Sequence, residues 1–290
     1  MKITWLGQAG LLFESNGIKL IVDPYLSDSV EKINPQNFRR VPVKEELFGE
    51  DIDIIVITHN HLDHLDPKTL ERFLNTDRVL TVLAPYYAWQ EVRKLGRNHN
   101  YVMFNRGTVW TQNGITLTAV KAEHSDLTAI GFIVDDSKEK LYITGDTLYN
   151  KDIFADLPQD IDTVFLPING VGNNMNITDA KRFAVKTGAK NAVPVHWGMF
   201  DELDPKGMIS ELCEAFPGVQ TEIHYRDDDE YDYLVDDEVC VVFINPCGDN
   251  ISVDLRGEFT LTCGGEEYVF FPDEEGFEEL CEEIRGILGE

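Results

Sequence analysis

The sequence has few cysteines, and their spacing is unpaired. The chain holds five, an odd number, and no two of them form a CxxC pair. A disulfide scaffold or a zinc ribbon needs paired spacing, so free thiols are the better interpretation. We therefore expect a protein of a reducing compartment, the cytoplasm.

Long apolar stretches are also absent. The longest apolar runs, such as that within residues 53–58, are far too short to span a bilayer. Met1 leads directly into a strand-like segment, with no apolar core of a signal peptide and no small-residue cleavage site. Because 43% of the 290 residues are hydrophobic, the chain can still bury a full core. A folded, soluble protein is expected.

Positive charge is scarce. Lysine and arginine number 25 against 52 acidic residues, which gives a formal net charge of −27. The excess is concentrated in residues 226–290, where 21 acidic residues face 3 basic ones. Such a surface repels nucleic acid and anionic membranes. The expected partner is a small-molecule substrate, with neither nucleic acid nor a membrane.

Short apolar runs separated by turn residues predict strands early in the chain, and helices alternate with strands further on. Strands are expected at residues 2–6, 11–14, 18–22, 54–57, 79–84, 115–120, 129–134, 141–143, 163–166 and 192–195. Helices are expected at residues 68–74 and 86–95, from Asn176 or Thr178 to about 187, and at 205–216. This order predicts an α/β fold whose sheets are covered by helices.

The pattern changes after about residue 226. Strand-like runs occur at residues 239–244, 251–255, 259–262 and 268–271, and an acidic helix is expected at 273–288. We interpret residues 1–226 as one domain and residues 227–290 as a small appended β-rich segment that ends in a helix.

Ionisable side chains crowd the segment that follows the apolar run 54–57. His59, His61, Asp63 and His64 fall within six positions. Burying even one of them without a partner is costly, so packing does not explain them. A His-rich loop can arise by chance. However, four such residues leaving a buried strand can converge on one point, and imidazole with carboxylate suits zinc, manganese or iron.

Three further residues of the same kind follow apolar strands. His124 comes after the strand at 115–120, Asp146 after that at 141–143, and His196 after that at 192–195. Sheets of α/β proteins place their sites at the carboxyl ends of strands. Any one of these residues alone would more often be structural, but with the first four they predict one metal centre.

The HxHxDH segment, with a later His, Asp and His on strand ends, resembles the metallo-β-lactamase superfamily over roughly residues 1–225. Four segments narrow the resemblance, namely WLGQAG at 5–10, LIVDPY at 20–25, ITHNHLDHLD at 57–66 and NITDA at 176–180. They are similar to the branch that contains L-ascorbate-6-phosphate lactonase and N-acylphosphatidylethanolamine phospholipase D-like proteins. The resemblance implies a four-layer αββα sandwich.

The resemblance also implies roles. It assigns a first metal ion to His59, His61 and His124, a second to Asp63, His64 and His196, and a bridge between the ions to Asp146. The implied reaction is attack by a metal-activated hydroxide on a lactone, or on a related ester or amide of a small polar metabolite, phosphorylated ones included. Asp63 is the predicted catalytic residue, which orients the nucleophile and carries a proton. Manganese follows from the resemblance, and zinc suits the ligand set.

Weaker predictions concern residues beside these motifs. The candidates to line the substrate pocket are Asn173, Asn174 and Trp197. The candidates to orient the imidazoles are Asp66, Asp126 and Thr147, for which plain turn or cap roles are equally good interpretations.

Other functions stay open. The same metal pair could cleave a phosphodiester in a lipid or nucleotide, and some superfamily members hold a single iron and oxidise thiols. A non-catalytic sensor or scaffold is a further alternative, but such proteins usually lose ligands and all seven positions are filled here. A homo-oligomer also stays open.

Overall fold

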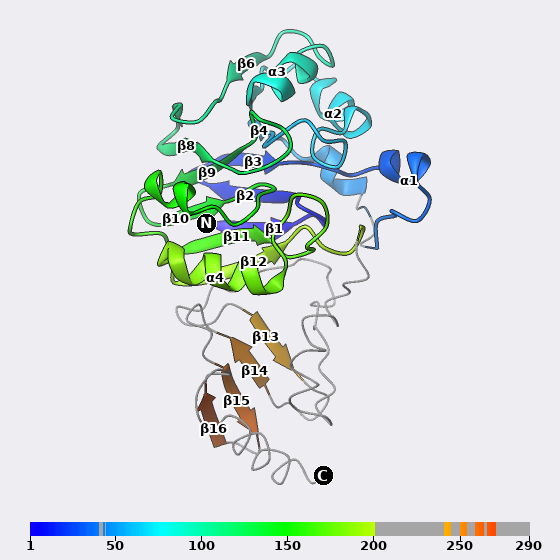
Figure 1. The fold of residues 1–290 in the computed structure, drawn as a ribbon. Coiled ribbons are helices and arrows are strands. Elements are labelled where there is room, and N and C mark those ends of the chain that lie inside the picture. The colour runs from blue at the N-terminus through cyan, green and yellow to red at the C-terminus, as the bar shows by residue number, and fades with distance from the viewer. Residues whose placement is uncertain are drawn as a thin grey trace.

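The computed structural model describes residues 1–40, 43 and 45–200, together with four strands between residues 241 and 270. Residues 1–200 form two six-stranded sheets with helices outside them (Figure 1). Sheet I has the order β1 (Lys2–Trp5), β2 (Leu11–Ser15), β3 (Ile18–Val22), β4 (Ile54–Val56), β5 (Thr81–Ala84) and β6 (Asn100–Met103). Sheet II has the order β12 (Asn191–Val195), β11 (Thr163–Pro167), β10 (Lys140–Ile143), β9 (Ile130–Asp135), β8 (Ile115–Lys121) and β7 (Val109–Gln112).

Both sheets combine antiparallel and parallel pairing. In sheet I the strands β1 to β3 are antiparallel neighbours, and β3 to β6 run parallel. In sheet II the strands β7 to β10 are antiparallel, and β10 to β12 run parallel. The inner parallel strands β4, β5 and β11 are buried along their whole length, which explains their continuous apolar sequences.

Helices cover the outer faces of the two sheets. Helices α2 (Pro67–Leu74) and α3 (Tyr86–Val92) lie against sheet I, and α4 (Ile177–Thr187) lies on the opposite side, against sheet II (Figure 1). The main core fills the space between the sheets, where Phe13 meets Phe165 edge to face at 5.8 Å between ring centroids. These layers confirm the αββα sandwich.

The two longest helices begin at the capping residues expected from the sequence. Asp66 accepts hydrogen bonds from the backbone N–H groups of the first turn of α2, with proline at the first helical position. Asn176 caps α4 in the same way, and α4 ends at Gly188, whose φ of 70° is a left-handed conformation that glycine adopts freely.

Several elements were not expected. They are β6, β7, α1 (Ser29–Ile33) and two 3₁₀ helices, η1 (Glu45–Gly49) and η2 (Lys151–Ala155). The strands β6 and β7 are the last in their sheets and have no fully buried residue, so they lack the apolar run that marks an inner strand. Helix α3 ends at Val92, three residues earlier than expected.

The later part of the chain contains an antiparallel four-stranded sheet in sequence order. Its strands are β13 (Val241–Ile244), β14 (Asn250–Val253), β15 (Phe259–Cys263) and β16 (Glu266–Phe270). They match the four predicted strands. The domain boundary at 226 and the helices expected at 205–216 and 273–288 lie outside the described residues. Within the described part, no helix is long and apolar enough to cross a membrane.

Candidate metal centre

The seven residues named from the sequence come together at the carboxyl ends of strands from both sheets. They form two groups, and within each group the candidate ligand atoms lie within 4.8 Å of one another. The first group is His59, His61, His124 and Asp146, and the second is Asp63, His64 and His196. The resemblance assigned the three histidines of the first group to one ion, the second group to the other and Asp146 to a bridge, whereas by distance Asp146 falls in the first group.

In the first group the imidazole nitrogens face one another. His61 Nδ1 lies 3.1 Å from His124 Nε2. The Nε2 atoms of His59 and His124 each lie 3.9 Å from Asp146 Oδ2. His59 is fully buried and its Nε2 has no hydrogen-bond partner.

The second group is tighter. His64 Nε2 lies 3.0 Å from His196 Nε2. Asp63 Oδ2 lies 3.1 Å from His196 Nε2 and 3.4 Å from His64 Nε2. All three residues are buried, so these contacts take place away from solvent.

Asp146 lies between the groups. Besides its contacts with the first group, its Oδ2 is 3.1 Å from His196 Nε2 and its Oδ1 is 3.3 Å from His64 Nε2. Asp146 Oδ1 is buried and has no hydrogen-bond partner. A single carboxylate therefore reaches the ligand atoms of both groups.

The residue that orients His64 is Asp23, to which the sequence analysis gave no role. Asp23 accepts hydrogen bonds from Thr58 N at 2.8 Å and Thr58 Oγ1 at 2.5 Å, and its Oδ2 lies 2.7 Å from His64 Nδ1. Because a carboxylate only accepts, His64 carries its proton on Nδ1 and presents the Nε2 lone pair to the centre. In sequence, Asp23 merely follows the strand expected at 18–22, and its partners Thr58 and His64 are distant along the chain.

The three residues considered for that orienting role act elsewhere. Asp66 caps α2, as the simpler interpretation had it. Asp126 Oδ2 accepts a hydrogen bond from Asn60 N at 3.1 Å, and Thr147 Oγ1 accepts one from Glu123 N at 2.9 Å. The latter two thus hold the backbone of the loops that carry the histidines, without contacting an imidazole.

Gln8 is a second residue that sequence reasoning missed. Its Nε2 donates to Asp63 Oδ2 at 3.0 Å and lies 3.2 Å from His196 Nε2, and its buried Oε1 has no partner. Asn169 Nδ2 lies 2.8 Å from Nδ1 of the same histidine. The WLGQAG segment joins two predicted strands, and no local pattern shows that its glutamine reaches a residue 55 positions away.

Left-handed backbone is concentrated around the second group. Gln8, Asp23 and His196 have φ values of 58°, 41° and 57°. Such conformations cost non-glycine residues of the order of 1 kcal/mol or more each and persist where the surroundings fix them. Here His196 N donates to Gln8 O at 2.9 Å, and Asp23 N donates to Val56 O at 3.0 Å. The fold therefore maintains strained backbone at the points that place these side chains.

The three candidate substrate residues differ in position. Asn174 Nδ2 donates to Asp146 Oδ2 at 2.8 Å, and Asn173 O lies 3.0 Å from His124 Nδ1, so both support the centre. Trp197 is only 8% exposed and stacks on Trp5 at 4.5 Å between ring centroids. Trp197 is therefore part of the core, and its role in lining a substrate pocket stays a prediction.

The centre concentrates negative charge. Asp23, Asp63 and Asp146 are buried, and none of them forms an ion pair with lysine or arginine among the described residues. Burial alone would raise the pKa of Asp63, but His64 and His196 hold it well below the usual range. Burial would likewise lower the pKa of His196, yet Asp146 and Asp63 raise it to about 9. The carboxylates thus draw positive charge to the site.

These features fit divalent cations. Two buried atoms of ligand type, His59 Nε2 and Asp146 Oδ1, have no hydrogen-bond partner. Imidazole nitrogens and carboxylate oxygens are ligands for zinc, manganese and iron, and a cation would supply the countercharge that the buried carboxylates lack. An αββα sandwich with such a centre at its strand ends defines the metallo-β-lactamase class of folds.

Comparisons with known proteins agree with the assignment to the metallo-β-lactamase class of folds. The family model described as the β-lactamase superfamily domain matches residues 19–197. A UPF0173 metal-dependent hydrolase of Archaeoglobus fulgidus is 32% identical over 254 residues, which cover 77% of this chain and 100% of the relative. The chain belongs to the β-lactamase superfamily, in the branch of the metal-dependent hydrolases.

Two further proteins are similar. The N-acyl-phosphatidylethanolamine-hydrolyzing phospholipase D 1 of Caenorhabditis elegans is 24% identical over 248 residues, 73% of this chain and 69% of that protein. Among solved structures, the metallo-hydrolase Igni18 of Ignicoccus hospitalis matches with a TM-score of 0.58 at 21% identity, covering 74% of this chain and 91% of that one. The latter likeness supports the fold.

Proposed function

We propose that this metal-dependent hydrolase works with two divalent ions, manganese or zinc, on a lactone or a related ester or amide of a small polar metabolite, phosphorylated metabolites included. The main support is that Asp146 lies close to both groups of candidate ligands, with its Oδ2 at 3.9 Å from His59 Nε2 and 3.1 Å from His196 Nε2. When bound, two such ions would lower the pKa of a water molecule and polarise a scissile carbonyl.

In this proposal the seven residues divide as the geometry groups them. His59, His61 and His124 would hold one ion and Asp63, His64 and His196 the other. Asp146, whose carboxylate lies near ligand atoms of both groups, would serve both. Asp23 fixes the Nε2 lone pair of His64 toward its ion, since it engages Nδ1. These residues are buried or half-buried, so bulk water is largely excluded from the ligand atoms.

Asp63 has a second task in the proposed reaction, which is to orient the nucleophile and carry its proton to the leaving group. Its Oδ2 already accepts the hydrogen bond from Gln8. The other carboxylate oxygen is the one left for proton transfer. Gln8 is a positioning residue here, since its contact fixes the rotation of the Asp63 carboxylate.

The test is elemental analysis of protein purified without chelator, alongside His61→Ala and Asp146→Ala. The matched control is His99→Ala, because His99 contacts Leu74 O and Leu80 N and lies outside both groups. All samples are assayed on a panel of lactones, phosphodiesters and thiols. We expect about two equivalents of manganese or zinc in the wild type and the control, and loss of metal and turnover in the two variants.

Two results would overturn the proposal. One equivalent of iron with thiol oxidation would move the protein to the oxygenase class. Absence of metal under every loading condition would favour a scaffold that has kept the ligands. The expected small-molecule partner and the cytoplasmic location remain predictions from charge and cysteine content.

Phosphodiester cleavage on a lipid or nucleotide is the second candidate. The likeness to the phospholipase D 1 of Caenorhabditis elegans supports it. So does Leu127, which is 88% exposed in the loop that follows His124 and could meet an apolar group. Turnover of phosphodiesters but not lactones in the same panel would favour this candidate.

A further inference from the structure

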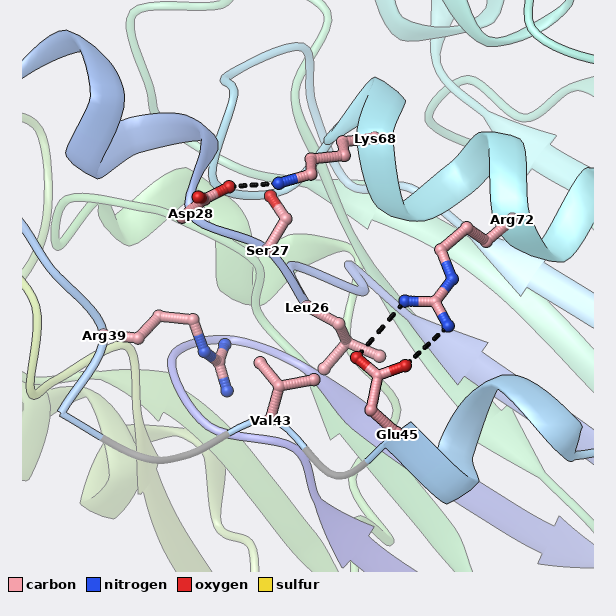
Figure 2. Close-up of a pocket in the computed structure, with 8 residues that line it drawn as sticks. All are labelled: Leu26, Ser27, Asp28, Arg39, Val43, Glu45, Lys68 and Arg72. Carbon is pink, nitrogen blue, oxygen red and sulfur yellow. Dashed lines mark hydrogen bonds and ion pairs between the residues drawn. The ribbon is translucent and has the colours of Figure 1, made fainter.

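A cavity of about 340 Å³ lies apart from the histidine cluster, between the loop after β3, the segment before η1 and helix α2 (Figure 2). Its lining residues are Leu26, Ser27, Asp28, Arg39, Val43, Glu45, Lys68 and Arg72. Five of these eight side chains are charged, and four of the five, Asp28, Glu45, Lys68 and Arg72, have side chains that are 45% to 72% exposed, so the cavity opens to solvent.

The charges of the lining do not balance. Lys68 forms an ion pair with Asp28, and Arg72 Nη2 lies 2.7 Å from Glu45 Oε2 (Figure 2). Arg39 forms no ion pair with a carboxylate among the described residues. The described lining therefore carries one uncompensated positive charge, in a chain whose formal net charge is −27.

The guanidinium of Arg39 has unused donors. Its Nη1 donates to Tyr25 O and its Nη2 donates to Leu6 O at 2.7 Å, while its buried Nε has no partner. An arginine has five N–H donors, so within the described part of the chain these two bonds leave three. Burial lowers the pKa of Arg39 to about 10, although Tyr25 and Asp66 act in the opposite direction. The Arg39 side chain is partly buried, and its guanidinium also lies over the Tyr25 ring at 5.6 Å from the centroid. Donors that remain unpaired in such a place are costly unless something binds them.

We propose that this cavity is a binding site for a small oxyanion with one negative charge, a carboxylate or a phosphate diester, held by the unused donors of Arg39. The planar fork of a guanidinium matches the oxygens of both groups. One negative charge balances the described lining without breaking the ion pairs of Lys68 and Arg72.

The cavity adjoins segments that carry the metal centre. Leu6, which accepts from Arg39, precedes the turn that presents Gln8. The neighbouring Arg40 N donates at 3.1 Å to Gly198 O, two residues after His196. An anion here is either part of a substrate whose reacting group lies at the centre or a separate ligand that stabilises these loops.

The direct test is NMR of the arginine Nε–H groups in ¹⁵N-labelled full-length protein, titrated with acetate and with dimethyl phosphate. One resonance should shift saturably and should be missing in Arg39→Lys. The Asp28→Asn variant, which removes a negative charge from the lining, should bind about two- to threefold more tightly. The matched control Arg93→Gln, at an exposed arginine after α3 whose guanidinium covers Trp89, should bind as the wild type does.

The tighter anion binding expected in Asp28→Asn cannot come from a misfolded variant. Absence of a saturable shift at Arg39 with both anions would overturn the proposal, as would a shift that disappears in His61→Ala, because the anion would then bind at the metal centre. The titration needs no turnover, so its failure is separate from that of the proposed hydrolase.

A kinetic comparison then distinguishes the two sources of the anion. If the anion belongs to the substrate, Arg39→Lys should raise KM at least several-fold for a lactone with a carboxylate and leave that of a neutral lactone unchanged. If Arg39→Lys changes the KM of neither lactone, while the wild type shows the saturable NMR shift, the site belongs to a separate anion.

Discussion

Asp23 offers the sharpest test of how the metal centre is held. Its carboxylate is 1% exposed, and one oxygen, Oδ2, receives both the Thr58 hydroxyl at 2.5 Å and the Nδ1 of His64 at 2.7 Å. In Asp23→Asn the amide nitrogen is itself a donor, so where it replaces Oδ2 it would face the N–H group at His64 Nδ1 or the Thr58 hydroxyl, and two donors would meet. The conflict is relieved if His64 moves its proton to Nε2, but that nitrogen then no longer offers a lone pair to a cation.

The size of the effect follows from these contacts. Losing hydrogen bonds to a buried charged acceptor costs about 1.5–3 kcal/mol of stability. Losing the group that orients a metal-binding histidine lowers metal affinity by about 10- to 100-fold. We therefore expect both a lower urea midpoint and metal loss at a chelator concentration that the wild type withstands.

Asp136→Asn is the matched control. Asp136 is also buried and accepts three hydrogen bonds, from Ser15 Oγ at 2.6 Å and from Lys138 N and Glu139 N at 3.0 Å each. It holds the turn between β9 and β10, away from the centre. This variant should lose comparable stability and keep its metal. Equal metal loss in both variants, or none in Asp23→Asn, would refute the orienting role.

Three other predictions follow from single contacts. Gly145→Ala should lower the unfolding free energy by at least about 2 kcal/mol in urea denaturation, because φ is +60° and a Cβ would lie 2.7 Å from Ile130 O; a loss below about 0.5 kcal/mol would show that the backbone relaxes. Gln8→Gly relieves a φ of 58° but removes the contact with Asp63. The variant should therefore lose its metal at a lower chelator concentration than the wild type, with little loss of stability in urea. Metal loss at the same chelator concentration as the wild type would count against the positioning role. Burial would raise the pKa of Asp136, but its hydrogen bonds keep it lowered, so its ionised form stabilises the fold above the unfolded-state pKa. The stability difference between wild type and Asp136→Asn should therefore shrink as pH falls below about 4, and a constant difference would contradict this account.

Most inner elements were predictable because their signals are local. The run at Ile54–Val56 is apolar throughout since both faces of β4 are covered, and Asp66-Pro67 marks the start of α2 by its own hydrogen bonds. The edge strands β6 and β7 were missed, since a strand with a solvent-exposed side has no such run. The end of α3 was misplaced by three residues, because its last turn is not distinguished by a cap of its own.

The candidate ligands were predictable for a different reason. His124, Asp146 and His196 are costly residues to bury, and each follows an apolar strand. The strands β8, β10 and β12 that precede them run in the same direction, so the three residues lie at one edge of sheet II. That argument names the residues without their distances. Trp197 was chosen for its place beside His196 in sequence, which says nothing of its packing against Trp5.

The sequence by itself determined the layered α/β fold and the seven residues that converge, because apolar periodicity and the cost of burying ionisable groups are properties of short segments. Only the tertiary structure decided that Asp23 holds His64, that Gln8 holds Asp63, and that Arg39 borders a cavity without a carboxylate partner. Those contacts join residues tens of positions apart, and their existence depends on how two sheets and their loops meet in space. Short sequence patterns therefore do not predict these contacts.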